Sequence, residues 1–309
     1  MKIQGIIPPL VTPLSERDSL DETGLAQLIE RQLTGRVDGL FVLGTTGEGP
    51  SLSEQLRRAM ISETSRLVNE RVPIYVGITD TSLVDAIHLA QFALEHGAAA
   101  VVAAPPFYFP AGQTELQHWF LELAEALPLP LLLYNMPSCV NISIEPETLA
   151  VLIKHPNIIG LKDSSGDLDY FAQAIEVAKQ REDWPVLMGP EALLVEAMKL
   201  GAVGGVTGGA NLWPELFTDL FAAARERDQA AIDRYQPIVV ELQALYGFGK
   251  YGSSYLKGLK CAMELSGICS GLLAAPFDVF KAPERARVAE WLTTFSASQT
   301  DFACQVPQV

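Results

Sequence analysis

The chain has 309 residues, of which 49% are hydrophobic and 19% are charged, with 37 acidic side chains against 22 basic ones. Such high hydrophobicity and low charge density exclude an intrinsically disordered chain. A net charge of −15 repels phosphate backbones and anionic lipids, so nucleic acid and membrane surfaces are excluded as partners. The length suits one large α/β barrel, which commonly takes about 250 residues, better than two ordinary domains.

The cysteines are scattered and none belongs to a CxxC pair, so we expect free thiols in a reducing compartment. Prolines interrupt the apolar N-terminal segment, a composition that is not typical of a secretory signal. No apolar run reaches the length of about 18 residues that a membrane span needs. The sequence therefore predicts a cytoplasmic protein.

Short apolar runs rich in Val, Ile and Leu recur from the N-terminus onward, and longer amphipathic segments separate them. The predicted strands are residues 6–11, 39–43, 74–78, 99–103, 131–134, 158–161, 186–188 and 204–207. Each gap except the last has room for one helix and two short loops, which is the signature of βαβ units.

The segments between these strands predict helices, because their apolar residues recur at helical spacing. The helix after Asp21 and the helix after Ser53 each have a capping residue at the start. The others are expected at residues 81–96, 113–127, 146–155, 168–181 and 191–200.

The predicted strands are apolar on both faces, as in a parallel sheet that helices cover. The first strand ends in Thr12-Pro13 without a GxGxxG loop, which disfavours a doubly wound open sheet. The sequence therefore predicts an α/β fold, a (β/α)8 TIM barrel over residues 1–211.

A C-terminal all-helical extension is expected over 212–295, with helices at 214–226, 229–246, 254–266 and 282–295. Residues 296–309 are polar and without a period, and we expect a loose tail there.

In a TIM barrel the loops after the C-terminal ends of the strands build the active site. The loop after the second strand, residues 44–49, combines three glycines with Thr45 and Thr46, and such a backbone can direct several N–H groups at an anion. A plain Gly-rich turn is the alternative. Tyr134 ends the fifth strand, and Tyr108 lies in a proline-bounded aromatic loop after the fourth. Tyr134 could alternatively be only a core aromatic residue, and the loop of Tyr108 could be only a surface for oligomer packing.

Lys162 directly follows the four apolar residues of the sixth strand. An amine at that place loses hydration, which favours its neutral form, and a neutral amine condenses with a carbonyl group to a Schiff base. The alternative is a lysine whose tip extends to solvent at the barrel rim.

Taken together and in order over residues 5–291, these motifs resemble the dihydrodipicolinate synthase/N-acetylneuraminate lyase family of Schiff-base-forming, pyruvate-type lyases. The resemblance implies that Lys162 forms a Schiff base with pyruvate or a longer 2-oxo acid, without a metal or another cofactor. It implies that Tyr134 shuttles the proton, with the Thr46 hydroxyl and Tyr108 completing a relay. Tyr108 would come from a neighbouring subunit of a homotetramer, a dimer of tight dimers.

The resemblance also implies a binding role for four residues. Thr45 and Thr46 would hold the carboxylate of the 2-oxo acid, and Gly189 and Val206 would shape the pocket. The chain departs from authentic dihydrodipicolinate synthases at Cys139, where an arginine is expected to hold the carboxylate of the second substrate. A thiol cannot replace a guanidinium group, and losing a charge-assisted hydrogen bond costs about 1.5–3 kcal/mol.

The chain departs from N-acetylneuraminate lyases too, in its Thr45-Thr46 pair and in the segment 189–192, Gly-Pro-Glu-Ala. Aldolases of 2-oxo-3-deoxy sugar acids or 4-hydroxy-2-oxo acids then remain, with 4-hydroxy-tetrahydrodipicolinate synthase as an alternative. Further alternatives are a sugar acid dehydratase and a non-catalytic barrel that binds 2-oxo acids. A metal-dependent aldolase is disfavoured, because none of the histidines follows a predicted strand: His88, His96, His118 and His155.

Overall fold

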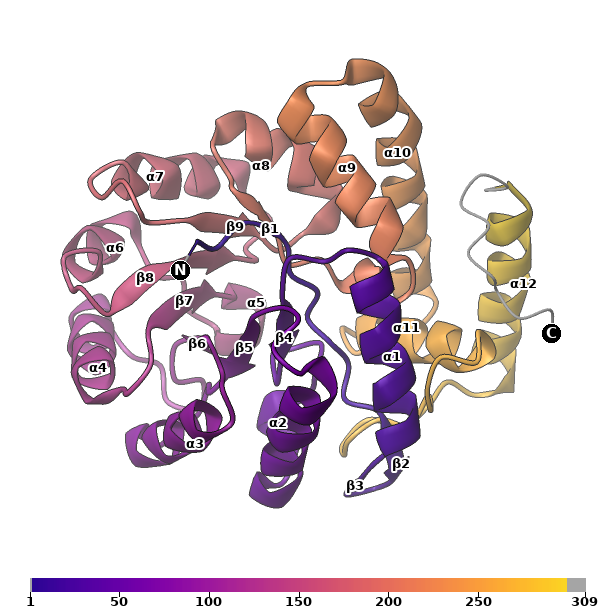
Figure 1. Ribbon diagram of the computed structural model, residues 1–309, viewed down its shortest axis with the longest axis horizontal. Helices are drawn as coiled ribbons and strands as arrows, with labels where there is room; N and C mark the ends of the chain where they lie inside the picture. The colour runs from indigo at the N-terminus through magenta and orange to yellow at the C-terminus, as the bar shows by residue number, and fades with distance from the viewer. Residues whose placement is uncertain (1, 299–309) are drawn as a thin grey trace.

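The computed structural model describes residues 2–298. Within them, eight parallel strands form one curved sheet in the order β1-β10-β9-β8-β7-β6-β5-β4. Helices surround the sheet (Figure 1). The strands are β1 Gly5–Ile6, β4 Leu40–Val42, β5 Ile74–Gly77, β6 Ala100–Ala103, β7 Leu131–Asn135, β8 Ile158–Asp163, β9 Val186–Met188 and β10 Gly204–Gly205.

The sheet closes on itself where the chain after β1 meets β4. Pro9 forms a parallel bridge with Phe41, whose N–H donates to the Pro8 carbonyl at 3.0 Å. The first strand is shorter than the predicted run 6–11, because Pro8 and Pro9 have no N–H to donate to a ladder. The predicted TIM barrel is confirmed.

Seven helices follow the first seven barrel strands and form an outer ring around them (Figure 1). The Asp21 and Ser53 side chains accept from backbone N–H groups in the first turns of α1 and α2, so both predicted caps are present. The helices are α1 Glu22–Thr34, α2 Glu54–Val68, α3 Leu83–Glu95, α4 Gln113–Ala126, α6 Pro146–Leu152, α7 Leu168–Ala178 and α8 Leu194–Leu200.

The eighth helix of the ring is α9 (Pro214–Glu226), which lies between α8 and α1 and packs against β1. The Thr218 hydroxyl donates to the carbonyl of Gly35 at the end of α1, 3.1 Å away. We therefore propose that the barrel unit ends after Glu226 and not at residue 211, because its first strand and first helix need α9 as cover.

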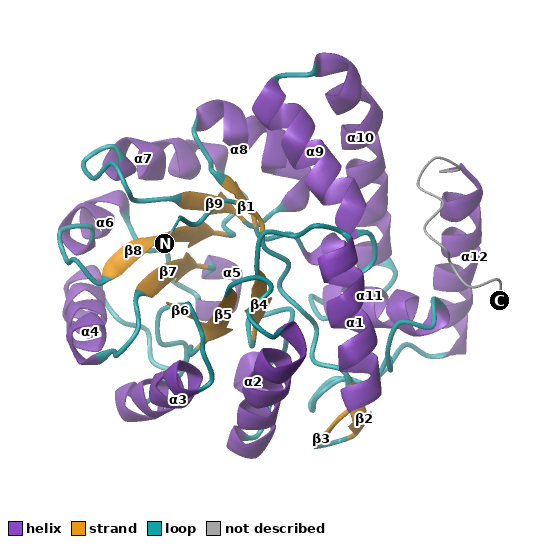
Figure 2. Ribbon diagram, in the orientation of Figure 1, coloured by secondary structure: helices purple, strands orange, loops and turns teal. Residues whose placement is uncertain are grey.

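The C-terminal extension is helical, as predicted (Figure 2). It contains α10 (Gln229–Leu242), a 3₁₀ helix at Gln243–Gly247, α11 (Ser254–Leu265) and α12 (Ala282–Ser298). Helix α12 continues three residues past the predicted end at Phe295, since nothing in its Ser-Ala-Ser end breaks a helix. The rest of the predicted tail, 299–309, lies outside the described residues.

Strands β7 and β8 run one and two residues further than predicted, because the polar ends of both strands keep the parallel ladder. Lys162 is therefore inside a strand and not directly after it. The small elements that were not predicted are a hairpin of β2 (Leu14–Glu16) and β3 (Ser19–Leu20), the short helix α5 (Pro137–Val140), and two 3₁₀ helices at Gly49–Ser51 and Gly208–Asn211.

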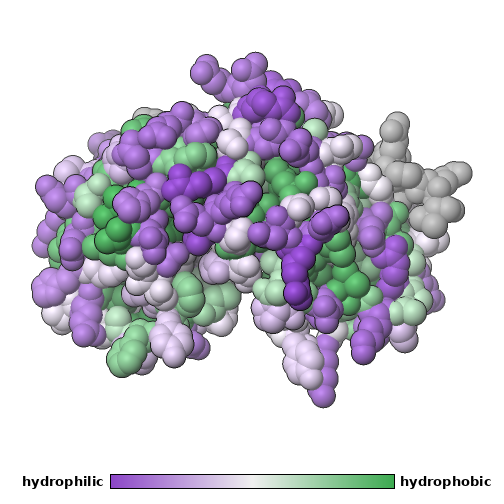
Figure 3. All heavy atoms as spheres, turned by 90° about the horizontal axis from the view of Figure 1, so that it is seen from below, coloured by the Kyte–Doolittle hydropathy of each residue, from purple (hydrophilic) through white to green (hydrophobic). Residues whose placement is uncertain are grey.

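Apolar side chains fill the space between sheet and helices, and a second apolar cluster fills the interior of the barrel. Seen from below, purple hydrophilic residues cover much of the surface, with green hydrophobic residues between them (Figure 3). No helix within residues 2–298 combines the length and apolar character needed to cross a bilayer.

The pairing of β1 with β10 in the sheet depends on close backbone contact, where Gly5 pairs with Gly204. A Cβ at position 204 would overlap the Gly5 carbonyl. We therefore expect Gly204→Ala to lower the free energy of unfolding by about 1–3 kcal/mol, the usual cost of overpacking. Urea denaturation measures this loss. Gly252→Ala is the control, because a Cβ there has no neighbour within 4 Å; equal stability of the two variants would contradict the expectation.

Candidate active site

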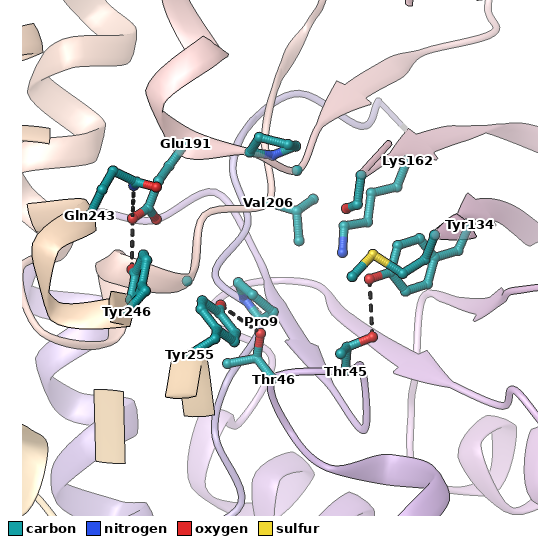
Figure 4. A pocket seen from close by; sticks show the side chains of 15 residues that line it. Pro9, Thr45, Thr46, Tyr134, Lys162, Glu191, Val206, Gln243, Tyr246 and Tyr255 are labelled. Carbon is teal, nitrogen blue, oxygen red and sulfur yellow. Dashed lines mark hydrogen bonds between the residues drawn. The ribbon is translucent and has the colours of Figure 1, made fainter. Parts of the chain in front are cut away.

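A cavity of about 220 Å³ lies at the C-terminal ends of the barrel strands, where the sequence places the active site. One end of the cavity holds Lys162 and Tyr134, and the other holds Glu191 and Tyr246 (Figure 4). The barrel supplies the first end, and the helical extension supplies much of the second. The cavity therefore joins the two parts of the fold.

Lys162 is the fifth residue of β8, and its backbone lies in register with Tyr134 of β7 and Leu187 of β9. The residue is only 4% exposed and lines the cavity. Its Nζ atom is 3.8 Å from the centroid of the Tyr134 ring and 5.5 Å from that of Phe41. The alternative of a lysine extending to bulk solvent is therefore wrong.

Polar residues one position after Tyr134 and Lys162 hold the ends of strands β7 and β8 together. The buried Asp163 carboxylate accepts from the Asn135 amide and the Ser165 hydroxyl, both at 2.8 Å. Burial raises the pKa of Asp163, although these hydrogen bonds oppose the rise. The Asn135 amide oxygen also accepts from the Ile144 N–H at 3.0 Å. This network fixes the register that makes Lys162 and Tyr134 neighbours, and sequence reasoning missed it.

The two threonines of the loop after β4 point to different partners. Thr45 shares a 3.1 Å hydrogen bond with the Tyr134 hydroxyl, and Thr46 shares a 3.0 Å hydrogen bond with Tyr255 of α11 (Figure 4). The expected relay of Tyr134 with Thr46 is therefore wrong, because successive side chains of this loop project in different directions. Thr45 is the partner of Tyr134.

The structure places the other expected site residues in two groups. Gly189, after β9, and Val206, after β10, line the cavity as expected. Cys139, in α5, is exposed and is not part of the cavity wall, and neither is Tyr108, which is 86% exposed. The adjacent Phe109 is 80% exposed, so this aromatic loop projects from the single chain.

The far wall of the cavity is centred on Glu191. Its carboxylate accepts from the Tyr246 hydroxyl at 2.7 Å, the Gln243 amide at 3.0 Å and the Gly209 N–H at 2.7 Å. Burial raises the pKa of Glu191, and the three donors oppose that rise.

Sequence reasoning missed Gln243, Tyr246 and Tyr255 as cavity residues. They come from helices of the extension, which carry no strand-end signal.

The charges of the cavity are few. Among the described residues that line it, Lys162 is the one basic side chain and Glu191 the one acidic side chain. No group of three or more His, Cys, Asp or Glu side chains within residues 2–298 is arranged to hold a metal ion. The wall offers hydroxyl, amide and phenol groups to a ligand, but no guanidinium group.

Residues 2–294 match the Dihydrodipicolinate synthetase family. The chain belongs to this family. It is a Schiff-base-forming lyase of the class I aldolase type, as the sequence motifs predict.

Relatives with different substrates resemble the chain. The probable 2-dehydro-3-deoxy-D-pentonate aldolase YjhH of Escherichia coli K12 is 30% identical over 288 residues, 93% of this chain and 94% of the relative. The structure of dihydrodipicolinate synthase from Bacteroides thetaiotaomicron is 48% identical with a TM-score of 0.92, covering 95% of this chain and 100% of that one. YagE, a prophage protein of E. coli K12 in the same family, was solved in complex with pyruvate. It is 28% identical with a TM-score of 0.90, and the match covers 95% and 99% of the two chains.

The raised pKa of Glu191 makes stability depend on pH. The folded state keeps a proton that the unfolded state releases above the ordinary pKa of 4.5. Wild type should therefore lose stability relative to Glu191→Gln as the pH rises from 4.5 towards the raised pKa. Urea unfolding of both proteins between about pH 4 and pH 8 measures this difference.

The matched control for this series is Glu241→Gln, which neutralises an exposed glutamate of α10. Its stability difference from wild type should stay nearly constant over the same range. A flat difference for Glu191→Gln as well would contradict the expectation.

Proposed function

We propose that the protein cleaves and forms the C3–C4 bond of 2-oxo-3-deoxy sugar acids through a Schiff base on Lys162. The observation that carries this proposal is the position of the Lys162 amine, buried in a cavity directly against Tyr134, whose hydroxyl is held by Thr45. A carbonyl group entering the cavity meets the amine and a phenol hydroxyl together.

In the proposed reaction the Lys162 amine adds to the C2 carbonyl of the substrate, and water leaves to give an iminium ion. The Tyr134 hydroxyl gives its proton to the hydroxide that leaves C2 as water. The resulting phenolate oxygen takes the proton of the C4 hydroxyl, the C3–C4 bond breaks, and the aldehyde departs. The electron pair of that bond forms an enamine with the iminium nitrogen. Protonation at C3 and addition of water then release pyruvate and restore the amine. Thr45 supports Tyr134 in holding and moving the proton.

The loop after β4 suits the carboxylate of the 2-oxo acid. Thr45 and Thr46 of this loop both line the cavity, where their hydroxyl groups can donate to a carboxylate. Gly189 and Val206 bound the space next to the substrate. Cys139 takes no part in this proposal, because it is outside the cavity wall.

The far wall favours an uncharged, hydroxylated substrate tail. Gln243 and Tyr246 offer hydrogen-bonding groups there, and Glu191 repels an anion when it is ionised. The relative YjhH, named a probable aldolase of a 2-dehydro-3-deoxy-pentonate, agrees with such a tail.

A second candidate is 4-hydroxy-tetrahydrodipicolinate synthase, which condenses pyruvate with aspartate-semialdehyde. The 48% identical structure of a dihydrodipicolinate synthase favours it. The cavity wall, however, offers the second carboxylate of that reaction no cation besides Lys162 among the described residues.

The proposal includes a metal-independent, cytoplasmic homotetramer. The exposed side chains of Tyr108 and Phe109 support an interface at their loop. There Tyr108 of a neighbouring subunit would approach the Tyr134–Thr45 pair.

Borohydride reduction in the presence of pyruvate tests the nucleophile. Hydride converts the iminium ion to a stable secondary amine, so wild type should gain the mass of a reduced pyruvate adduct on the peptide that contains Lys162. Lys162→Met should gain none and should show no cleavage activity. Lys199→Met, which removes an exposed lysine of α8, is the control and should be labelled like wild type. Labelling of Lys162→Met, or unlabelled wild type, would contradict the proposal.

A comparison of substrates tests which aldehyde the enzyme releases from, or condenses with, pyruvate. We expect kcat/KM for cleavage of a five- or six-carbon 2-oxo-3-deoxy sugar acid to exceed kcat/KM for condensation with aspartate-semialdehyde. The margin should be roughly ten- to more than a hundredfold, the equivalent of one missing charge-assisted hydrogen bond. Pyruvate release and pyruvate consumption are the two readouts, and the reverse preference would establish the synthase.

A further inference from the structure

Helix α11 contacts the loop after β4 at two places, although it follows that loop by about 200 residues in the chain. Tyr255, in its first turn, shares a 3.0 Å hydrogen bond with Thr46. Lys260, five residues further along the same helix, forms an ion pair with Glu48 at 2.6 Å. Both ends of the segment from Thr46 to Glu48 are thus attached to one helix.

The ion pair of Glu48 and Lys260 is completely buried, since both side chains are 0% exposed. Lys260 also donates to the Leu272 carbonyl at 2.5 Å, and Glu48 accepts from the Ala274 N–H at 2.8 Å. Buried charges persist only when paired and hydrogen-bonded in this way. The pair therefore defines one position of the loop relative to the extension.

The backbone of the loop needs such support. Leu43 and Glu48, at its two ends, adopt the left-handed region with φ of 60° and 57°. Residues other than glycine rarely adopt it, and they keep it only where surrounding contacts impose it. At Glu48 those contacts are the ones from Lys260 and Ala274.

Two glycines allow α11 to pack closely against the segment after β10 and against the 3₁₀ helix at Gln243–Gly247. A Cβ at Gly208, after β10, would overlap the Tyr255 hydroxyl, and a Cβ at Gly258 of α11 would overlap the Leu245 carbonyl. Desolvation raises the pKa of Tyr255 well above its ordinary value, so the phenol is neutral and keeps its proton for hydrogen bonding.

We infer that Tyr255, Lys260 and Glu48 are positioning residues, which hold the loop of Thr45 and Thr46 in the geometry that binds the carboxylate of the 2-oxo acid. This inference rests on the proposed function. It makes the helical extension part of substrate recognition. The extension acts through the loop of Thr45 and Thr46 and not through Lys162. A purely structural role would instead lower stability and leave the binding of pyruvate unchanged in the folded protein.

The concentration dependence of borohydride trapping by pyruvate separates these roles in the full-length protein. Tyr255→Phe removes one hydroxyl and keeps the ring. It should raise the pyruvate concentration for half-maximal trapping roughly three- to tenfold, the range for one lost hydrogen bond. The maximal trapping rate should stay within about twofold. Trapping by acetone, which has no carboxylate, should keep its second-order rate.

Glu48→Gln tests whether the effect passes through the loop, because Glu48 is not part of the cavity wall. It should produce the same change for pyruvate and none for acetone. If it does not fold, as judged by circular dichroism, Tyr255→Phe alone decides. The control is Tyr170→Phe, which removes a buried hydroxyl bonded to the Ile144 carbonyl, outside the cavity. It should change stability only.

Three results would overturn the inference: an unchanged half-maximal concentration in Tyr255→Phe, equal losses for pyruvate and acetone, or a folded Glu48→Gln that traps pyruvate like wild type. Failure of the proposed function itself looks different, because wild type would then trap no pyruvate at all.

Discussion

The register between β7 and β8 is the constraint on which the site depends. It places Lys162 opposite Tyr134 across one pair of adjacent parallel strands, so the amine and the phenol are neighbours without help from any flexible loop. The buried network of Asp163 and Asn135 secures that register at the next position. A shift of β8 by one residue would direct the Lys162 side chain out of the barrel interior and away from Tyr134.

Around this pair, the two parts of the fold contribute different properties to the cavity. The barrel supplies the amine, the phenol and the loop of Thr45 and Thr46. The extension supplies the opposite wall, whose Glu191 network joins the loop after β9 to the 3₁₀ helix at Gln243–Gly247. In the proposed reaction the chemistry thus resides in the barrel, whereas the wall that would meet the variable end of a substrate is shared with later helices.

Much of this could be predicted from the sequence, for physical reasons. Apolar strands at regular spacing predict the barrel, and a lysine or a tyrosine at a strand end must lie on its catalytic face. Which threonine pairs with Tyr134 depends on side-chain direction in a glycine-rich loop, which spacing does not determine. The contact of Glu48 with Lys260 joins residues 212 positions apart. It follows from how the extension folds back, and no local pattern predicts it.

The close packing of α11 against the loop after β4 has a consequence for the whole architecture. A polypeptide ending after α9 would retain every strand, all eight surrounding helices and the reactive amine. It would nevertheless expose Glu48 without its counterion and leave one side of the cavity open to water. The barrel is therefore not an independent module whose helical extension evolution or an engineer could freely replace with another segment. Any replacement must also neutralise that carboxylate from outside.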